Sequence, residues 1–180
     1  LEEQVANDRI QIGLSFDSFV IERWQRDRDV FVSTAKELGA DVNVQTASGG
    51  VKEQIDQIEY FIEKNMDVIV IIPIDSELIK DVVLKAKQKG IKIIAYDRLI
   101  KDANVDLYIS FDNEKVGKLM GEAIIANTPQ KGKISVIFGS QTDHNVMQVE
   151  KGFEKAIART SLEIVHKDYA QRWLAEEAFA

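Results

Sequence analysis

Two short polar segments of this sequence contain the residues best suited to chemistry. Arg23 and Trp24 are expected directly after an apolar run at residues 9–16 that predicts a β-strand, and Asp97 and Arg98 end a later run of the same kind. Ligands of α/β proteins bind in the crevice beyond the carboxyl ends of the strands. An indole packs on the C–H faces of a polyol, while guanidinium and carboxylate groups hydrogen-bond its hydroxyl pairs. These residues therefore predict a site for a neutral, sugar-like ligand.

The elements that must position these side chains follow a regular alternation. Apolar runs predict strands at residues 9–16, 42–46, 67–73 and 91–96. The segments between them carry apolar residues at helical spacing. Continuous apolar runs are typical of strands buried on both faces, as in a parallel sheet between helices. Because crossovers between parallel strands are right-handed, the sequence predicts an α/β fold with a doubly wound parallel sheet.

A second unit of the same kind begins after residue 111. The first lobe ends with a short predicted strand at residues 107–111. The second unit then has predicted strands at 133–138 and 162–165, and Asp112 is placed to cap its first helix, which precedes residue 133. Two strands and two helices bury too little apolar surface for an independent lobe. We therefore expect a first α/β lobe at residues 8–111 and the start of a second, incomplete lobe at residues 112–180.

Composition excludes several functional classes. The chain has 180 residues and a net charge of −7, which argues against a nucleic-acid surface. It contains no cysteine, so disulfides and cysteine zinc sites are excluded. Its two histidines, His144 and His166, lack carboxylates at ligand spacing, and no glycine-rich phosphate loop or Gly-x-Ser-x-Gly elbow occurs. We expect no metal, no cofactor and no catalytic residues, and hence a protein that is not an enzyme.

Longer motifs bring a family resemblance. The motifs are ERWQRDRD at residues 22–29, VIIP at 70–73, AYDR at 95–98 and YISFDNEKVG at 108–117. With them the chain resembles periplasmic sugar-binding proteins of the ribose/galactose type (type I periplasmic binding proteins). The resemblance is greatest to the D-xylose-binding branch of bacterial ABC importers, and it covers residues 9 to about 175.

The resemblance implies a two-lobed protein that closes on a pentose held in the cleft between the lobes, with a hinge near residues 111–113. It also implies a tryptophan from each lobe on the sugar ring and polar groups from both lobes on the hydroxyls. His144 departs from the residue expected between the polar pair of the second lobe. The ligand-binding residues predicted in this way are Arg23, Trp24, Asp97, Arg98, Asp143, Asn145 and Trp173.

Each of these residues also has a purely structural alternative. Trp24 is large and apolar enough to belong to the core. Trp173 is a candidate for a rim residue that covers a helix end. Asp97 and Arg98 are adjacent and of opposite charge, so they are candidates for an ion pair with each other. Asp143 is a default N-cap for the helix that follows it.

The leading functional hypothesis is an extracytoplasmic solute-binding protein, in the periplasm or lipid-anchored on the outer face of the membrane. It captures D-xylose or a related pentose or hexose and presents the closed form to the membrane permease of an ABC importer. The alternative partner is the extracytoplasmic domain of a sensor histidine kinase. A second alternative is the effector domain of a sugar-responsive repressor, which requires a DNA-binding head.

Overall fold

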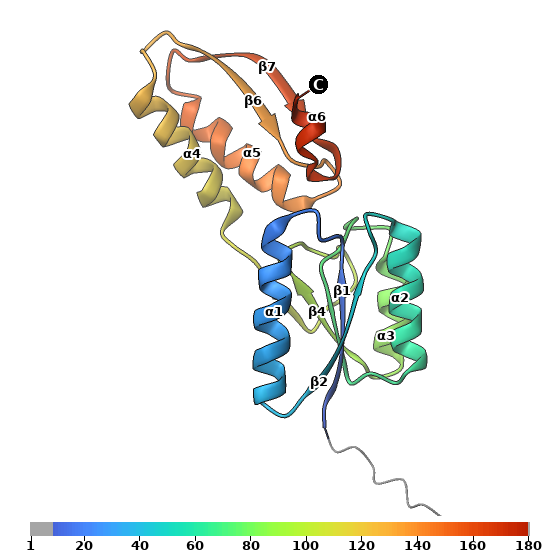
Figure 1. Cartoon of the computed structure of the whole chain (residues 1–180). Coiled ribbons are helices and arrows are strands. Elements are labelled where there is room, and N and C mark those ends of the chain that lie inside the picture. The colour runs from blue at the N-terminus through green and yellow to red at the C-terminus, as the bar shows by residue number, and fades with distance from the viewer. Residues whose placement is uncertain (1–8, 180) are drawn as a thin grey trace, which may run out of the picture.

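The computed structural model describes residues 9–179 and contains two parallel β-sheets, which confirms the predicted α/β class. The first sheet has five strands in the order β2-β1-β3-β4-β5, and the second pairs β6 with β7. Figure 1 shows the strands of the first sheet pointing toward the second sheet. The strands are β1 (Gln11–Phe16), β2 (Asp41–Thr46), β3 (Val68–Ile71), β4 (Lys92–Tyr96), β5 (Leu107–Ile109), β6 (Lys133–Phe138) and β7 (Glu163–Tyr169).

Helices cover both faces of the first sheet, with α1 on one face and α2 and α3 on the other (Figure 1). This explains the continuous apolar run of β3. Val70 packs with the α1 side, whereas Ile69 and Ile71 pack in the cluster on the α2 and α3 side. The helices are α1 (Glu22–Glu37), α2 (Val51–Glu63), α3 (Lys80–Gln88), α4 (Asn113–Asn127), α5 (His144–Ile157), the 3₁₀ helix η1 (Gln171–Trp173) and α6 (Ala175–Phe179).

Around the second sheet, α4 and α5 pack closely because glycines stand where the helices meet. A Cβ atom added at Gly117 would lie 1.8 Å from the carbonyl oxygen of Val149, and one at Gly152 would lie 1.9 Å from that of Glu114. Side chains at these two positions would force the helices apart. The carboxylate of Asp112 accepts a hydrogen bond from the Lys115 N–H at 3.0 Å, so the predicted cap of α4 is confirmed.

Several predicted strand limits differ from the structure. The strands predicted at residues 9–16, 67–73, 91–96 and 107–111 are shorter, and the one predicted at 42–46 begins one residue earlier. The strand predicted at 162–165 is wrong in extent, because β7 runs from Glu163 to Tyr169. Its second half is polar and lacks an apolar signal, but it pairs with β6 as far as Phe138. Pairing with a neighbouring strand, and not local hydrophobicity, sets the length of this strand.

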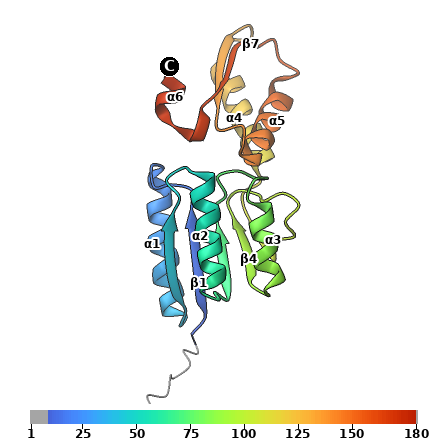
Figure 2. The same ribbon diagram turned by 90° about the vertical axis from the view of Figure 1, so that its right-hand side faces the viewer.

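The carboxyl edge of the first sheet faces the second part of the molecule (Figures 1 and 2). Strands β1, β3 and β4 end at this edge, and α4, α5 and η1 lie beyond it. The predicted lobe boundary between residues 111 and 112 falls between β5 and α4. The division into lobes stays a prediction, and its outer limits, residues 8 and 180, lie outside the described residues.

Candidate functional site

All the sequence-predicted site residues line one cavity of about 330 Å³ between the first sheet and the second part of the chain. This volume lies at the lower end of the range of small-molecule sites. The first turn of α1 supplies Arg23 and Trp24, the segment after β4 supplies Asp97 and Arg98, the start of α5 supplies Asp143 and Asn145, and η1 supplies Trp173.

The Arg98 side chain lies between carboxylates from both sides of the cavity. Its Nη1 donates to Oδ2 of Asp17 at 2.7 Å and to the Pro73 carbonyl at 3.2 Å. Its Nε lies 3.0 Å from Oδ2 of Asp143, and all three side chains of these ion pairs are buried. The alternative that Arg98 simply pairs with its neighbour Asp97 is wrong, since its ion pairs are with these two other carboxylates.

Asp97 belongs to a second polar group across the same cavity. Its carboxylate accepts a hydrogen bond from Nη2 of Arg23, and its Oδ1 accepts one from Nδ2 of Asn145 at 3.2 Å. The same Asn145 amide donates to the Asp97 carbonyl at 3.0 Å. Asp97 has a left-handed backbone with φ of 63°, a conformation that is uncommon outside glycine. The first-sheet side and the start of α5 are thus in direct contact through Arg98–Asp143, Asp97–Asn145 and the hydrogen bond from the Tyr108 hydroxyl to Oδ1 of Asn145 at 3.3 Å.

Trp24 is both a core residue and a cavity residue. Its side chain is 2% exposed and packs with Phe16 and Tyr96, which fits the core alternative. It also lines the cavity, and the guanidinium carbon of Arg23 lies 4.1 Å from its ring centroid. Within the described part of the chain, its Nε1 is buried without a hydrogen-bond partner.

Trp173 lies on the opposite wall and is 41% exposed. Its Nε1 donates to Oδ2 of Asp143 at 3.1 Å. Its ring lies against Gly139, where an added Cβ atom would be 2.3 Å from the indole. The residue has a φ of 59°, a left-handed backbone that is uncommon for a tryptophan. The indole is therefore fixed by a hydrogen bond on one side and by a glycine on the other.

Asp143 serves as the helix cap that the structural alternative proposed and also faces the cavity. Its Oδ1 accepts the N–H of Asn145 at 2.9 Å, while its Oδ2 contacts Arg98 and Trp173. Burial raises the pKa of the Asp143 carboxyl, and the nearby Arg98 guanidinium opposes that shift. A carboxylate that is buried but paired in this way is held in one orientation.

Sequence reasoning missed other residues at the site. Phe111 and Asn113 line the cavity, although the sequence assigned this stretch only to a hinge. Asp17 was also missed, because Arg23 and Trp24 were expected directly after the first strand. Residues 17–21 separate β1 from α1, and Asp17 is the first residue beyond the strand. Its position at a strand end was the signal that would have found it.

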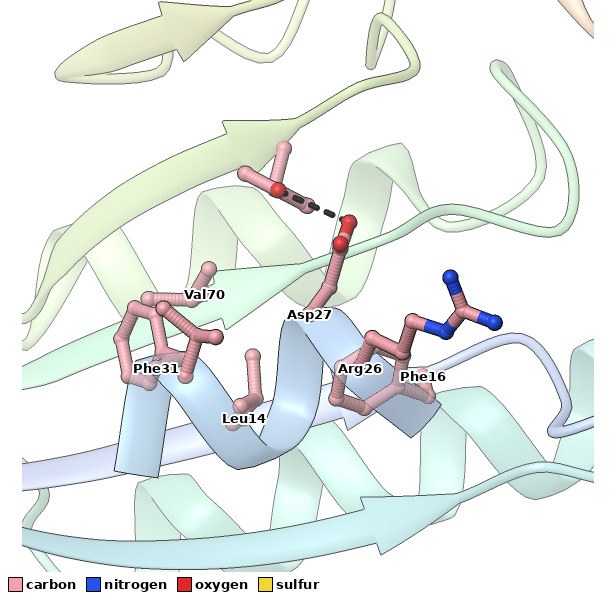
Figure 3. A pocket seen from close by; sticks show the side chains of 8 residues that line it. Leu14, Phe16, Arg26, Asp27, Phe31 and Val70 are labelled. Carbon is pink, nitrogen blue, oxygen red and sulfur yellow. Dashed lines mark hydrogen bonds between the residues drawn. The ribbon is translucent and has the colours of Figure 1, made fainter. Parts of the chain in front are cut away.

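A separate cavity of about 230 Å³ lies between α1 and the first sheet (Figure 3). Its walls are mainly apolar, with Leu14, Phe31 and Val70 among them. The Tyr96 hydroxyl donates to Oδ2 of Asp27 at 2.9 Å, the bond drawn in Figure 3. Burial, helped by this carboxylate, raises the pKa of Tyr96 to about 12, so the phenol stays neutral and donates at neutral pH. None of the predicted site residues lines this cavity.

Two further properties of residues 9–179 bear on function. Within this stretch, no cluster of three or more His, Cys, Asp or Glu side chains is placed to hold a metal ion. Over the same residues, none of the helices combines the length and the apolar character that crossing a membrane requires.

The sequence pattern of the periplasmic binding protein domain matches residues 12–180. The chain belongs to this family. This confirms the resemblance found in the sequence motifs.

Individual relatives of this periplasmic binding domain agree with the family match. A D-xylose-binding periplasmic protein from Haemophilus influenzae is 46% identical over 173 residues, which cover 94% of this chain and 52% of the relative. One from Escherichia coli is 43% identical over 173 residues, with the same shares of 94% and 52%. The chain therefore spans about half the length of these curated relatives.

A solved structure agrees as well. It is an ABC transporter periplasmic solute-binding protein from Actinobacillus succinogenes with bound D-allose. It is 27% identical and superposes with a TM-score of 0.85, covering 94% of this chain and 62% of that one. The relatives are binding proteins by name, not enzymes.

Proposed function

We propose that this protein is an extracytoplasmic solute-binding protein that captures a monosaccharide, D-xylose, and presents the bound form to an ABC importer. The observation that carries the proposal is the convergence of all the sequence-predicted ligand residues on one cavity. Two indoles, two guanidinium groups, two carboxylates and two amides line that cavity and match the C–H faces and hydroxyls of a sugar. D-xylose is the sugar named for relatives that are 46% and 43% identical.

Capture of the sugar favours the closed arrangement in this proposal. Trp24 and Arg98 come from the first sheet side, whereas Asp143 and Trp173 come from the other. A sugar between them gains contacts with both sides only when they are close together. A ligand shifts a conformational equilibrium through such a difference in contacts.

Titration calorimetry on the full-length protein tests the ligand. We expect heat of binding with D-xylose and weaker binding of D-ribose, D-glucose and D-galactose. The sugar recovered after incubation should be unchanged, since the protein is proposed to bind and not to catalyse. Binding of none of the four sugars, or turnover of D-xylose, would contradict the proposal.

The partner requires a separate experiment, because importer and sensor versions use the same sugar site. The full-length protein is incubated with detergent-solubilised membranes of its own organism, with and without D-xylose, and the captured proteins are identified. Recovery of a permease without a histidine kinase supports the importer version. Recovery of a kinase without a permease would replace the importer by the sensor. Recovery of neither, together with a DNA-binding segment in the full-length protein, would favour the repressor version.

A further inference from the structure

Asp17 is a buried carboxylate at the edge of the site that does not itself line the cavity. It follows β1 directly and is 6% exposed. Its backbone carbonyl accepts the N–H of Gly49 at 3.0 Å, which fixes the main chain at this point. Burying a charge is costly unless the charge is paired. Its partner is Arg98, whose Nη1 donates to Oδ2 at 2.7 Å.

This pairing fixes one edge of the Arg98 guanidinium. Nη1 of Arg98 also donates to the carbonyl of Pro73. Asp17, which follows β1, and Pro73, which follows β3, therefore accept hydrogen bonds from the same nitrogen. In the described part of the chain, all the hydrogen bonds of this guanidinium come from Nη1. The Nη2 edge is thus available to donate to a ligand in the cavity that Arg98 lines.

The carboxylates on the two sides of Arg98 differ in one respect that matters for binding. Asp17 and Arg98 both follow strands of the first sheet, β1 and β4, whereas Asp143 caps α5 on the other side of the cavity. In the opening that the proposed function requires, contact with Asp143 is lost and contact with Asp17 is kept. A group that is already in place when the ligand arrives loses less conformational freedom on binding.

We propose that Asp17 is a positioning residue that holds the Arg98 guanidinium ready for the ligand, independently of the other side of the cavity. This inference rests on the proposed function and deepens it. Asp17 acts only through Arg98, so its effect on sugar affinity must depend on the side chain at position 98.

The first test compares Asp17→Asn with a matched control in the full-length protein. The amide keeps the shape of Asp17 and one acceptor oxygen but removes the charge. We expect the affinity for D-xylose to fall about tenfold, because small displacements of a binding group are costly. The control is Asp67→Asn, since the Asp67 carboxylate accepts the Gln11 N–H at 2.7 Å near the start of β1 and so lies far from the cavity. It should leave the affinity within about twofold of the unmodified protein.

The second test is a double-mutant cycle with Arg98→Lys, which keeps a positive charge but lacks the planar fork. In that background we expect Asp17→Asn to lower the D-xylose affinity by less than about threefold, because the fork that it positions is absent. A residue that only supports the fold would cost the same factor in both backgrounds. The same four proteins are unfolded in urea, so that coupling between positions 17 and 98 is also measured without sugar.

The outcomes separate this inference from the proposed function. If the unmodified protein binds none of the tested sugars, the proposed function fails, and coupling in the urea cycle still decides whether Asp17 holds Arg98. If D-xylose binds but Asp17→Asn behaves like Asp67→Asn, the positioning role is overturned. Equal losses in the two backgrounds overturn it as well. If Arg98→Lys abolishes measurable binding, the urea cycle decides, and absence of coupling there overturns it.

Discussion

At the scale of single residues, the two tryptophans of the site are held in different ways. Trp24 is anchored by burial among Phe16 and Tyr96, whereas Trp173 is partly exposed and anchored by its bond to Asp143. Replacing Trp24 should therefore lower both the ligand affinity and the stability of the fold, whereas replacing Trp173 should lower mainly the ligand affinity.

Trp173→Ala should weaken D-xylose binding more than tenfold while lowering the melting temperature little. The expected loss corresponds to about 1–3 kcal/mol of stacking and buried area. The measurements are calorimetry and thermal unfolding of the full-length protein. Phe179→Ala is the control, since Phe179 is 95% exposed and lies outside the cavity. Equal affinities for Trp173→Ala and the control would mean that Trp173 only covers a helix end.

Trp24→Ala should also weaken D-xylose binding more than tenfold, but with a loss of stability of about 3–5 kcal/mol because a buried indole is removed. Trp24→Phe keeps an aromatic ring and should recover part of both losses. Urea unfolding measures the stability, and calorimetry at a temperature where both variants are folded measures the affinity. An unchanged affinity in folded Trp24→Ala would make the ring a packing residue alone.

At the scale of elements, the site depends on how α5 is placed, since Asp143 and Asn145 lie at its start. The helix approaches α4 through the glycines at positions 117 and 152, where any side chain would meet backbone of the other helix. The distance between α4 and α5 therefore affects where Asp143 and Asn145 lie in the cavity.

Gly152→Ala should lower the free energy of unfolding by about 2 kcal/mol, because overpacking shifts the backbone, and it should weaken D-xylose binding by moving the start of α5. Met147→Ala is the control on the same helix, because Met147 is 55% exposed. It should change the unfolding free energy by less than about 0.5 kcal/mol. Urea unfolding and calorimetry test both effects, and a Gly152→Ala protein as stable as the control would contradict the close packing.

The edge of the first sheet carries a charge whose effect depends on pH. Asp106 accepts bonds from Nζ of Lys87 at 2.7 Å and from the Ile93 N–H at 2.9 Å. The Lys87 ammonium first, and then the backbone bond, lower the pKa of Asp106 from 3.8 to about 2. A carboxyl whose pKa is lowered by folding stabilises the fold above its unfolded pKa. That contribution disappears as the pH falls through its folded pKa.

Asp106→Asn should therefore destabilise the protein at neutral pH by about 1 kcal/mol, a modest value because the side chain is partly exposed. The difference from the unmodified protein should shrink as the pH falls from about 4 to about 2, the interval between the unfolded and folded pKa values of Asp106. Urea unfolding at a series of pH values measures it. Asp56→Asn, which removes an exposed i,i+4 pair with Lys52, is the control and should show little effect. If the difference in unfolding free energy between Asp106→Asn and the unmodified protein did not change with pH, the stabilising role of the Asp106 carboxylate would be refuted.

At the scale of the whole molecule, the second sheet is the less covered part of the structure. In β6 and β7, Ile137 and Val165 are 49% and 50% exposed, and in α4 Leu119 and Met120 are 54% and 50% exposed. The first sheet, by contrast, is packed by helices on both faces. The cavity wall with Trp24 and Arg98 therefore belongs to the better packed part of the molecule, and the wall with Asp143 and Trp173 belongs to the less covered part.

The 180-residue chain should bind D-xylose at least tenfold more weakly than the D-xylose-binding relative from Haemophilus influenzae, of which it spans 52%. Its second wall has less apolar packing to hold Asp143 and Trp173 in place. Calorimetry on both proteins under the same conditions tests this. Equal affinities would indicate that these residues suffice for the site and that packing beyond them adds nothing to binding.

The sequence by itself determined the alternation of strands and helices, the parallel α/β class and the family, and it predicted a set of ligand residues. The fold class follows from apolar periodicity, and the family and the predicted ligand residues follow from short motifs such as those at residues 22–29 and 95–98, all of which are local in the chain. Only the tertiary structure decided how the polar residues pair. Asp17 and Arg98 are 81 residues apart and meet because β1 and β4 flank β3 in the sheet. Ion pairs of this kind depend on the order of the strands in the sheet and on where α5 approaches it. The residues next to Asp17 or Arg98 in the sequence do not specify either feature.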